Sequence, residues 1–367
     1  MAIERLLALC AVLAAFAAVL VVQRLTGRSA LALWTLPVAV CVLGIGAVLS
    51  AVVGVAQGLD MFGLIHLAYV FAVVAVPLSG AGLLVLAARQ GAAAAVVVAA
   101  SLMLLPAPIG IYATHIAPYL LHVDERRVPV PAARDGDDPV RIGVLADLQT
   151  SGVGDHERAA VRALMEARPD VIVLPGDLFQ ADDDTLRRKG PAARELLAQL
   201  QAPGGVYFVE GDVDRHDRLS MLLPPNITRL EDEVVTVHLG DRTLHLGGTD
   251  LDHTSPAADA VRDELRASTG ALTVLVSHRP DTVLGLPADA GVDLVVAGHT
   301  HGGQLALPRI GAPMTLSAVP RAVGSGGLHE VHGNPIYVSS GVGIERGQAP
   351  QFRFGVRPSI GLLLLEG

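Results

Sequence analysis

The chain has 367 residues, enough for two domains, and 51% of them are hydrophobic while only 17% are charged. The net charge of −9 is unevenly spread, because residues 1–122 contain four basic and two acidic residues and residues 123–367 must therefore carry −11. This acidic balance in the second part argues against nucleic acid as the main partner.

Residues 1–122 are predicted to form a transmembrane region of about four helices. A helix that crosses a bilayer needs about 20 apolar residues. Four apolar runs come near this length: Leu6–Val22, Ala30–Val55, Met61–Ala88 and Ala92–Tyr112. A cleaved signal peptide is the alternative for the first run. Because three further runs follow it without a clear cleavage pattern, we favour a multi-pass membrane protein.

Basic residues in the short loops indicate on which side of the membrane the second part lies. Arg126 and Arg127 are discounted, because they lead into a long segment that crosses membranes largely regardless of charge. The remaining basic residues are Arg24, Arg28 and Arg89 in the first and third loops, against Arg5 on the opposite side. The prediction is a cell-membrane protein whose C-terminal domain is extracytoplasmic.

A polar linker is expected at residues 123–138 and an α/β domain at residues 139–367. The first half of this domain alternates strand patterns with helix patterns, which is the signal for βαβ units. Three expected strands, at 140–146, 171–174 and 206–209, each end close to an acidic residue: Asp147, Asp177 and Asp212. An Asp after a strand is commonly a helix N-cap, but three in succession fit that explanation poorly.

The second half of the domain has histidines at the corresponding places. Three of them follow apolar strand patterns at 272–276 and 293–297: His278, His299 and His301. In an extended backbone, residues i and i+2 point the same way, so the last two imidazoles can reach into one cleft. Most other histidines lack this placement, but His216 and His253 lie in loops near strand ends and remain candidates.

Together with Gln149, these side chains form a set of three Asp, one Gln and three His. Both cysteines, Cys10 and Cys41, fall within predicted membrane spans, so the second domain has no thiolate ligand. Nitrogen and oxygen ligands without sulfur suit Mn, Fe or Zn. The set is large enough for two divalent metal ions, which a shared carboxylate can hold about 3.5–4 Å apart.

Five short motifs contain these residues: Asp147-Leu148-Gln149, Gly176-Asp177, Gly211-Asp212-Val213-Asp214, Ser277-His278 and Gly298-His299-Thr300-His301-Gly302-Gly303-Gln304. In this order they resemble the calcineurin-like metallophosphoesterase superfamily. Two C-terminal stretches, 337–343 and 353–358, resemble its membrane-associated bacterial branch. The resemblance covers about residues 138–367. It implies two facing mixed β-sheets flanked by helices, with the metals at one edge.

The resemblance also implies a ligand set: Asp147, Gln149, Asp177 and His301 for one metal, and Asp177 as a bridge to a second metal that Asp212, His278 and His299 complete. Two positions depart from the family pattern, which commonly has His at Gln149 and Asn-His at Asp212-Val213. Valine can neither steady a phosphoryl group nor protonate a leaving oxygen. Either His216 or His253 takes over that catalytic task, or the substrate has a good leaving group, or catalysis is feeble.

Two functional hypotheses follow. The leading one is a membrane-anchored dinuclear-metal phosphoesterase that hydrolyses a phosphate mono- or diester with a metal-activated water. Its substrate would lie near the bilayer, as a lipid head group or an envelope precursor does, although fold and motif determine the chemistry far better than the substrate. The alternative is a metal-binding pseudo-enzyme, a sensor or scaffold that binds phosphoryl groups with little or no turnover.

Overall fold

The computed structural model describes residues 2–367, which form two compact units. One consists of the residues up to Ile116 together with Arg346–Gln351, and the other consists of Ala117–Glu345 and Phe352–Gly367. The boundary lies at residue 116 rather than at the expected 122. The physical reason is that the chain from His122 onward already forms an edge strand of the second unit.

The first unit is helical and apolar. Its helices are α1 (Ala2–Thr26), α2 (Thr35–Ala56), α3 (Met61–Val70), α4 (Val76–Gln90), α5 (Ala94–Leu102) and α6 (Pro106–His115), with a π-helical turn (Phe71–Ala75) between α3 and α4. They provide four stretches that are long and apolar enough to cross a membrane: Ile3–Thr26, Thr35–Ala56, Met61–Gln90 and Ala94–Tyr119. The predicted four candidate membrane helices are thereby confirmed.

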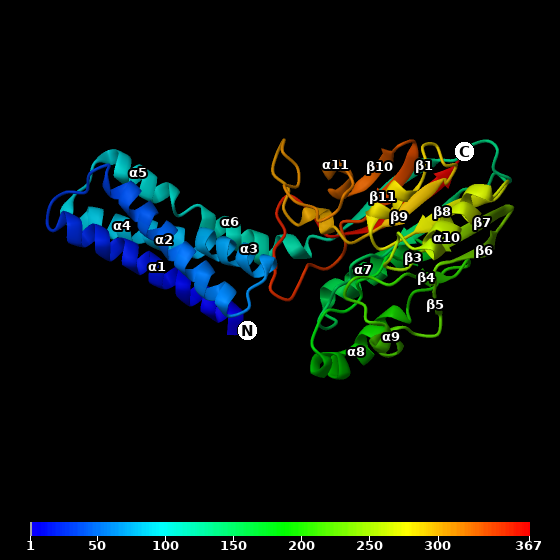
Figure 1. Cartoon of the computed structure of the whole chain (residues 1–367), viewed down its shortest axis with the longest axis horizontal. Helices are drawn as coiled ribbons and strands as arrows, with labels where there is room; N and C mark the ends of the chain where they lie inside the picture. Colours follow the sequence, from blue (N-terminus) through cyan, green and yellow to red (C-terminus); the bar gives the residue numbers. More distant parts are fainter. Residues whose placement is uncertain (1) are drawn as a thin grey trace. The chain divides into compact units, whose positions relative to one another are not determined.

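The second unit contains two six-stranded mixed sheets (Figure 1). The first sheet has the order β1 (His122–Pro129), β12 (Ser359–Glu366), β2 (Val140–Val144), β3 (Val171–Leu174), β4 (Val206–Phe208) and β5 (Ile227–Arg229). The second has the order β10 (Gly327–Val331), β11 (Asn334–Val338), β9 (Leu294–Ala297), β8 (Leu272–Val276), β7 (Arg242–Gly248) and β6 (Glu233–Leu239).

Burial distinguishes central strands from edge strands. β3, β8 and β9 are buried at every residue, as expected of parallel strands covered on both faces. β1 lies at an edge and pairs in parallel with β12, from His122 opposite Ser359 to Pro129 opposite Glu366. Part of the segment expected as a linker is therefore a strand, held by a partner more than 200 residues away in the sequence.

The core lies between the two sheets, where side chains such as Val144, Val173, Val274 and Val296 meet. Helices α7 (Asp155–Glu166), α8 (Asp183–Leu197) and α9 (His216–Leu222) pack on the outer face of the first sheet, and α10 (Pro256–Ala267) and the short α11 (Arg321–Gly324) pack on that of the second (Figure 1). This is the predicted fold of two facing mixed sheets flanked by helices.

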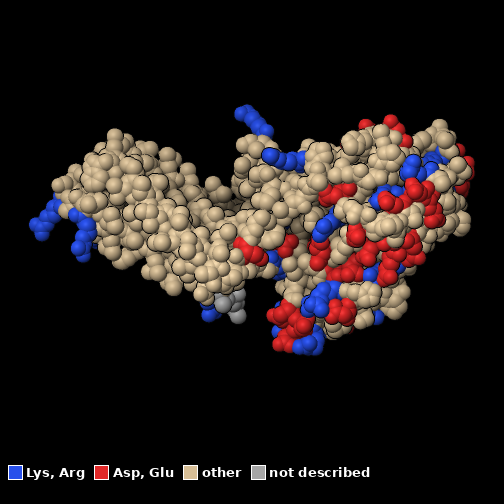
Figure 2. Space-filling view, viewed as in Figure 1, with Lys and Arg blue, Asp and Glu red and all other residues tan. Residues whose placement is uncertain are grey.

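Charge separates the two units as the sequence predicts. Lys, Arg, Asp and Glu side chains gather over the second unit, whereas the helical unit shows only a few at its ends in the view of Figure 2. A surface nearly free of charge suits helices in contact with lipid.

Candidate metal centre

Five of the predicted ligands follow the carboxyl ends of strands. β2, β3 and β4 precede Asp147, Asp177 and Asp212, and β8 and β9 precede His278 and His299. Because β2, β3 and β4 are parallel to one another, and β8 is parallel to β9, the residues that follow them collect at one edge of each sheet. Hydrogen bonds hold the loops there, since Asp147 N donates to Gly176 O and Gly298 N donates to His278 O, both at 3.0 Å.

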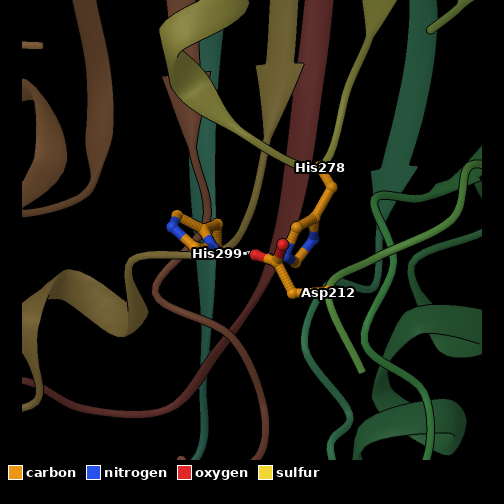
Figure 3. Close-up of side chains that lie close together, drawn as sticks. All are labelled: Asp212, His278 and His299. Atoms are coloured by element: carbon orange, nitrogen blue, oxygen red, sulfur yellow. Dashed lines mark hydrogen bonds and ion pairs between the residues drawn. The ribbon is translucent and has the colours of Figure 1, made fainter. Parts of the chain in front are cut away.

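Asp212, His278 and His299 form the first group of candidate ligands (Figure 3). Asp212 Oδ2 lies 2.8 Å from His299 Nδ1 and 3.3 Å from His278 Nε2. The two ring nitrogens are 3.3 Å apart, and the carboxylate lies between the rings in Figure 3. Two imidazole nitrogens and a carboxylate oxygen that converge in this way are ligands that Mn, Fe and Zn accept.

Asp147, Asp177 and His278 form a second, fully buried group. It adjoins the first, because His278 belongs to both and its Nε2 lies 3.5 Å from Asp177 Oδ2. Two buried atoms, Asp147 Oδ2 and His301 Nε2, have no hydrogen-bond partner among the described residues. A buried polar atom without a partner costs about 1–3 kcal/mol, and more when charged. Divalent cations would supply the missing partners, so the residues present fit the metal that their chemistry predicts.

Gln149 is also buried at this edge. Its amide nitrogen donates to Gln180 Oε1 and to Glu345 Oε2, both at 3.1 Å. The amide nitrogen is thus committed to protein acceptors, and the amide oxygen is the atom that can bind a cation. This arrangement fits the predicted role of Gln149, with the oxygen in place of the imidazole nitrogen that is usual in the family.

The electrostatics of the centre reflect crowded negative charge. Burial raises the pKa of Asp147 to about 7, and burial lowers the pKa of His301 well below its usual value, which keeps its imidazole neutral. Burial alone would lower the pKa of His278, but the carboxylates of Asp177 and Asp212 raise it to about 10. Burial, not charge, is the main cause of the raised pKa of Asp147, whereas the imidazole of His278, held in its charged form by carboxylates, points to negative charge that a cation would neutralise.

Left-handed backbone conformations are frequent at the centre. Five of the seven predicted ligands have a positive φ: Asp147 (47°), Gln149 (35°), Asp177 (56°), His299 (71°) and His301 (49°). Each such residue costs of order 1–3 kcal/mol and persists only where the surrounding structure enforces it. The strain is therefore concentrated at the residues whose side chains must converge.

Two glycines make room for Asp147. A Cβ at Gly298 would lie 2.7 Å from Asp147 Oδ2, and a Cβ at Gly341 (φ 69°) would lie 2.7 Å from Asp147 Cβ. Gly341 belongs to the C-terminal stretch that resembles the bacterial branch, so that stretch contributes a wall of the centre.

Arg279 neutralises the aspartate that stands where the family commonly has asparagine. Its guanidinium donates to both carboxylate oxygens of Asp212, with Nε 3.4 Å from Oδ2. Positive groups hold the pKa of Asp212 well below its usual range in spite of burial: His278 first, then His299 and Arg279. The Arg279 side chain is 42% exposed, so it lies at the mouth of the centre.

Asp214 shapes the loop that contains Val213. Its carboxylate accepts hydrogen bonds from the backbone N–H groups of Asp177 (2.6 Å), Leu178 (2.9 Å) and Gly211 (3.0 Å). Val213 N in turn donates to Asp177 Oδ1 at 2.9 Å. The Asp214 carboxylate thus joins the backbones of the second and third motifs. Val213 is held beside the carboxylate of Asp177, which is the predicted bridge.

The two candidate catalytic histidines are not part of the cluster. His216 begins α9, its side chain is 74% exposed, and its Nδ1 lies 2.8 Å from Arg229 and 4.0 Å from Glu210. His253 is partly buried in the loop before α10, where its carbonyl accepts from Arg262. Neither side chain contacts a predicted ligand among the described residues, and their catalytic role stays a prediction.

Sequence reasoning did not single out Arg279, Asp214 and Arg353. Arg353 is fully buried and donates to the carbonyl oxygens of Ser340 (2.7 Å), Gly341 (3.0 Å) and Gly343 (2.5 Å), and its Nη2 lies 3.5 Å from His301 Nδ1. The available signals were positional: Arg279 directly follows His278, Asp214 closes the third motif, and Arg353 opens the last C-terminal stretch.

Comparison with known proteins agrees with this geometry. Residues 140–303 match the calcineurin-like phosphoesterase family. The chain carries a calcineurin-like metallophosphoesterase domain. The uncharacterized metallophosphoesterase YkuE of Bacillus subtilis is 26% identical over 271 residues, which is 70% of this chain and 89% of YkuE. The phosphodiesterase YaeI of Escherichia coli is 28% identical, over 63% of this chain and 84% of YaeI.

A transmembrane protein with metallophosphoesterase domain from Bos taurus is 26% identical, over 65% of this chain and 56% of the bovine protein. At least one relative is thus named as a transmembrane protein with this kind of domain. The family is one of metal-dependent phosphoric ester hydrolases, the class that the motifs predicted, and it implies divalent metal ions.

Proposed function

We propose that this protein is a multi-pass membrane phosphoesterase whose second unit binds two divalent metal ions. Asp147, Gln149, Asp177 and His301 are assigned to one ion, and Asp177, Asp212, His278 and His299 to the other. The observation that carries this proposal is the pair of adjoining ligand groups, together with the unpartnered buried atoms Asp147 Oδ2 and His301 Nε2.

Two metal ions, if bound by these residues, would supply Lewis acidity that activates a water and offsets the charge of a phosphoryl group. The residues of the chain would exclude water and orient the metal ligands. Asp147, His301 and Gln149 are buried and exclude water from one side of the centre. His278 is fixed by its Nδ1, which lies 2.8 Å from the carbonyl oxygen of Pro175, so that its Nε2 points at the carboxylates.

Arg279 is the group that the geometry favours for contact with the phosphoryl oxygens. Nε and Nη2 bind Asp212, whereas Nη1 has no hydrogen-bond partner among the described residues, and the side chain as a whole is 42% exposed. A guanidinium is a strong donor to phosphate oxygens. It stays protonated at neutral pH, so it can steady charge there but cannot protonate a leaving oxygen. That second task remains the predicted role of His216 or His253.

The substrate that we propose is a phosphate mono- or diester at the membrane, lipid-linked or part of the cell envelope. Four candidate membrane helices in the same chain support this choice, because a tethered domain meets molecules of the bilayer at high local concentration. The proposed location of the domain is extracytoplasmic. The relative named a phosphodiesterase supports the ester class.

The Val213 position also favours a second candidate, a metal-binding pseudo-enzyme that retains phosphoryl groups. One experiment separates the two: the full chain in detergent, supplied with Mn²⁺, is assayed for metal content and for turnover of bis(4-nitrophenyl) phosphate. Asp177→Asn removes a predicted bridge, and Asp263→Asn, on exposed α10, serves as the matched control. Turnover lost only in Asp177→Asn supports the enzyme. Two bound metals without turnover in the unmodified chain would support the pseudo-enzyme.

A further inference from the structure

The loop of residues 305–318, which we name the rim loop, concentrates exposed apolar side chains. It follows the histidine motif and ends just before α11. Nine large hydrophobic side chains are exposed among the described residues of the second unit, and four of them are in this loop: Leu307, Ile310, Met314 and Leu316. Ile310 is the most exposed, at 67%. Such a patch on one short segment indicates an interaction surface.

The rim loop is held in a defined shape beside the metal centre. Leu307 N donates to Gly311 O (3.0 Å) and Gly311 N donates to Leu307 O (2.9 Å), which closes a tight turn with Ile310 near its tip. At its base, Ala306 N donates to Phe354 O at 2.7 Å. Its returning arm passes the centre, where Leu316 O lies 3.3 Å from His299 Nε2. The loop that carries the apolar side chains is thus held by its backbone, and its returning arm lies beside a predicted metal ligand.

Charge indicates what this surface meets. Residues 123–367 carry −11, yet the rim loop contains no acidic residue and one arginine, Arg309. Arg309 forms no ion pair with any residue that the structure describes, and it lies in the turn next to Ile310. Apolar side chains combined with a basic one suit the interface of an anionic bilayer. A protein partner would find charged surface elsewhere on the acidic second unit and does not need this loop. A bilayer is the surface that the chain always has nearby, because it contains four candidate membrane helices.

We propose that the rim loop inserts into the interfacial layer of an anionic bilayer, with Ile310 among the acyl chains and Arg309 at the lipid phosphates. The ester of a lipid would then reach the adjacent metal centre without leaving the membrane. The consequence for substrates rests on the proposed phosphoesterase function, whereas the contact with the bilayer does not.

The contact is tested with a single tryptophan in the full chain. Trp34 is the only tryptophan, so Trp34→Phe gives a silent background in which Ile310→Trp reports on the loop. Met221→Trp, at an exposed apolar position on α9, is the matched control. In vesicles of phosphatidylglycerol and phosphatidylcholine, lipids brominated near the head-group end of the acyl chains should quench the fluorescence of the Ile310→Trp protein and leave that of the Met221→Trp protein unquenched. Equal quenching of the two proteins, or none of the Ile310→Trp protein, would overturn the proposal. The proposal would also be overturned if the indole at position 310 became protected from water only as the amount of protein per vesicle was raised. That result would show that a second copy of the chain covers the loop.

The functional consequence is tested with Ile310→Ser and Arg309→Asn, where Asn suits the positive φ of 66° at that position. We expect about a tenfold or greater rise in KM for a phosphodiester borne by the vesicle, since burial of one such side chain is worth at least that factor. The KM for soluble bis(4-nitrophenyl) phosphate should not change. Equal effects on both esters would contradict a role in reaching lipid. Absence of turnover of either ester would count against the proposed function alone, because the quenching result needs no activity.

Discussion

The rate of this enzyme should depend steeply on the acidity of the leaving group. Val213 stands where the family commonly has a histidine, and Arg279, which binds the neighbouring Asp212, cannot give up a proton at neutral pH. An aryl phosphodiester, whose phenolate leaves with little help, should turn over readily. An alkyl diester, whose alkoxide needs a proton, should lag behind it.

The structure allows the missing help to be restored at a defined place. The backbone of Val213 is fixed, because its N–H donates to Asp177 Oδ1 at 2.9 Å and Asp214 ties the same loop to the second motif. A histidine at position 213 would therefore have its backbone held beside the centre. General acid catalysis contributes about 10²–10⁴-fold, or roughly 3–5 kcal/mol of barrier. Val213→His combined with Asp212→Asn should recover part of that range for the alkyl ester.

The assay is kcat/KM for a series of phosphodiesters, plotted against the pKa of the leaving alcohol or phenol. We expect a steep negative slope for the unmodified chain and a shallower one for the double variant, with the aryl end nearly unchanged. If His216 or His253 has taken over, its replacement by alanine should slow the alkyl esters selectively. His238→Ala, exposed on β6, is the control. A flat plot for the unmodified chain, with neither histidine mattering, would refute the interpretation of Val213 as a lost general acid.

Three further predictions concern the metals, the topology and a buried arginine. Asp177→Asn should release both metals together, because one carboxylate is assigned to both, and metal analysis that finds one ion at full occupancy would exclude a bridge. A reporter fused after Gly367 should give an extracytoplasmic signal, and a cytoplasmic signal would reverse the proposed orientation. Arg353→Met removes the hydrogen-bond donor to the carbonyl groups of Ser340 and Gly343, whereas Gly341 O keeps its bond from Ser359 N, so it should cost about 2 kcal/mol or more and lower Tm by roughly 4–8 °C. An unchanged melting curve would mean that water replaces the guanidinium.

The sequence predicted the parts of the centre that follow from strand periodicity. Asp147, Asp177, His278 and His299 stand directly after runs that could only be buried strands, and parallel strands collect such positions at one edge. Short-range alternation of strand and helix indicated an α/β domain. The two facing sheets and the assignment of ligands to two metals came instead from the resemblance to the metallophosphoesterase superfamily.

Features that depend on distant parts of the chain could not be predicted. The sequence of β1 was interpreted as a polar linker, because the exposed side chains of β1 are charged. Its partner strand β12 is more than 200 residues away, so local sequence does not indicate the pairing. The pairing of Arg279 with Asp212 depends on side-chain positions in two different sheets. Arg353 is fully buried, against the usual expectation for arginine, because the carbonyl groups of Ser340, Gly341 and Gly343 surround its guanidinium and accept its hydrogen bonds.

That pairing of Arg279 with Asp212 accounts for the unusual charge of the centre. An aspartate in place of the family's asparagine adds one negative charge, and Arg279 adds one positive charge beside it, so the pair carries the same net charge as asparagine alone. We therefore expect Arg279→Gln to raise the KM for bis(4-nitrophenyl) phosphate, and Asp212→Asn to leave Arg279 unbalanced. The double variant should be less impaired than the two single effects predict. Because the Arg279 side chain is 42% exposed and screened by water, the coupling between the two should be modest, about 1 kcal/mol or roughly fivefold in kcat/KM. Dissociation constants for Mn²⁺, measured on the same four proteins, provide a readout independent of activity. Strictly additive effects in both measurements would show that the two side chains act separately and that the substitution at Asp212 is not balanced by Arg279.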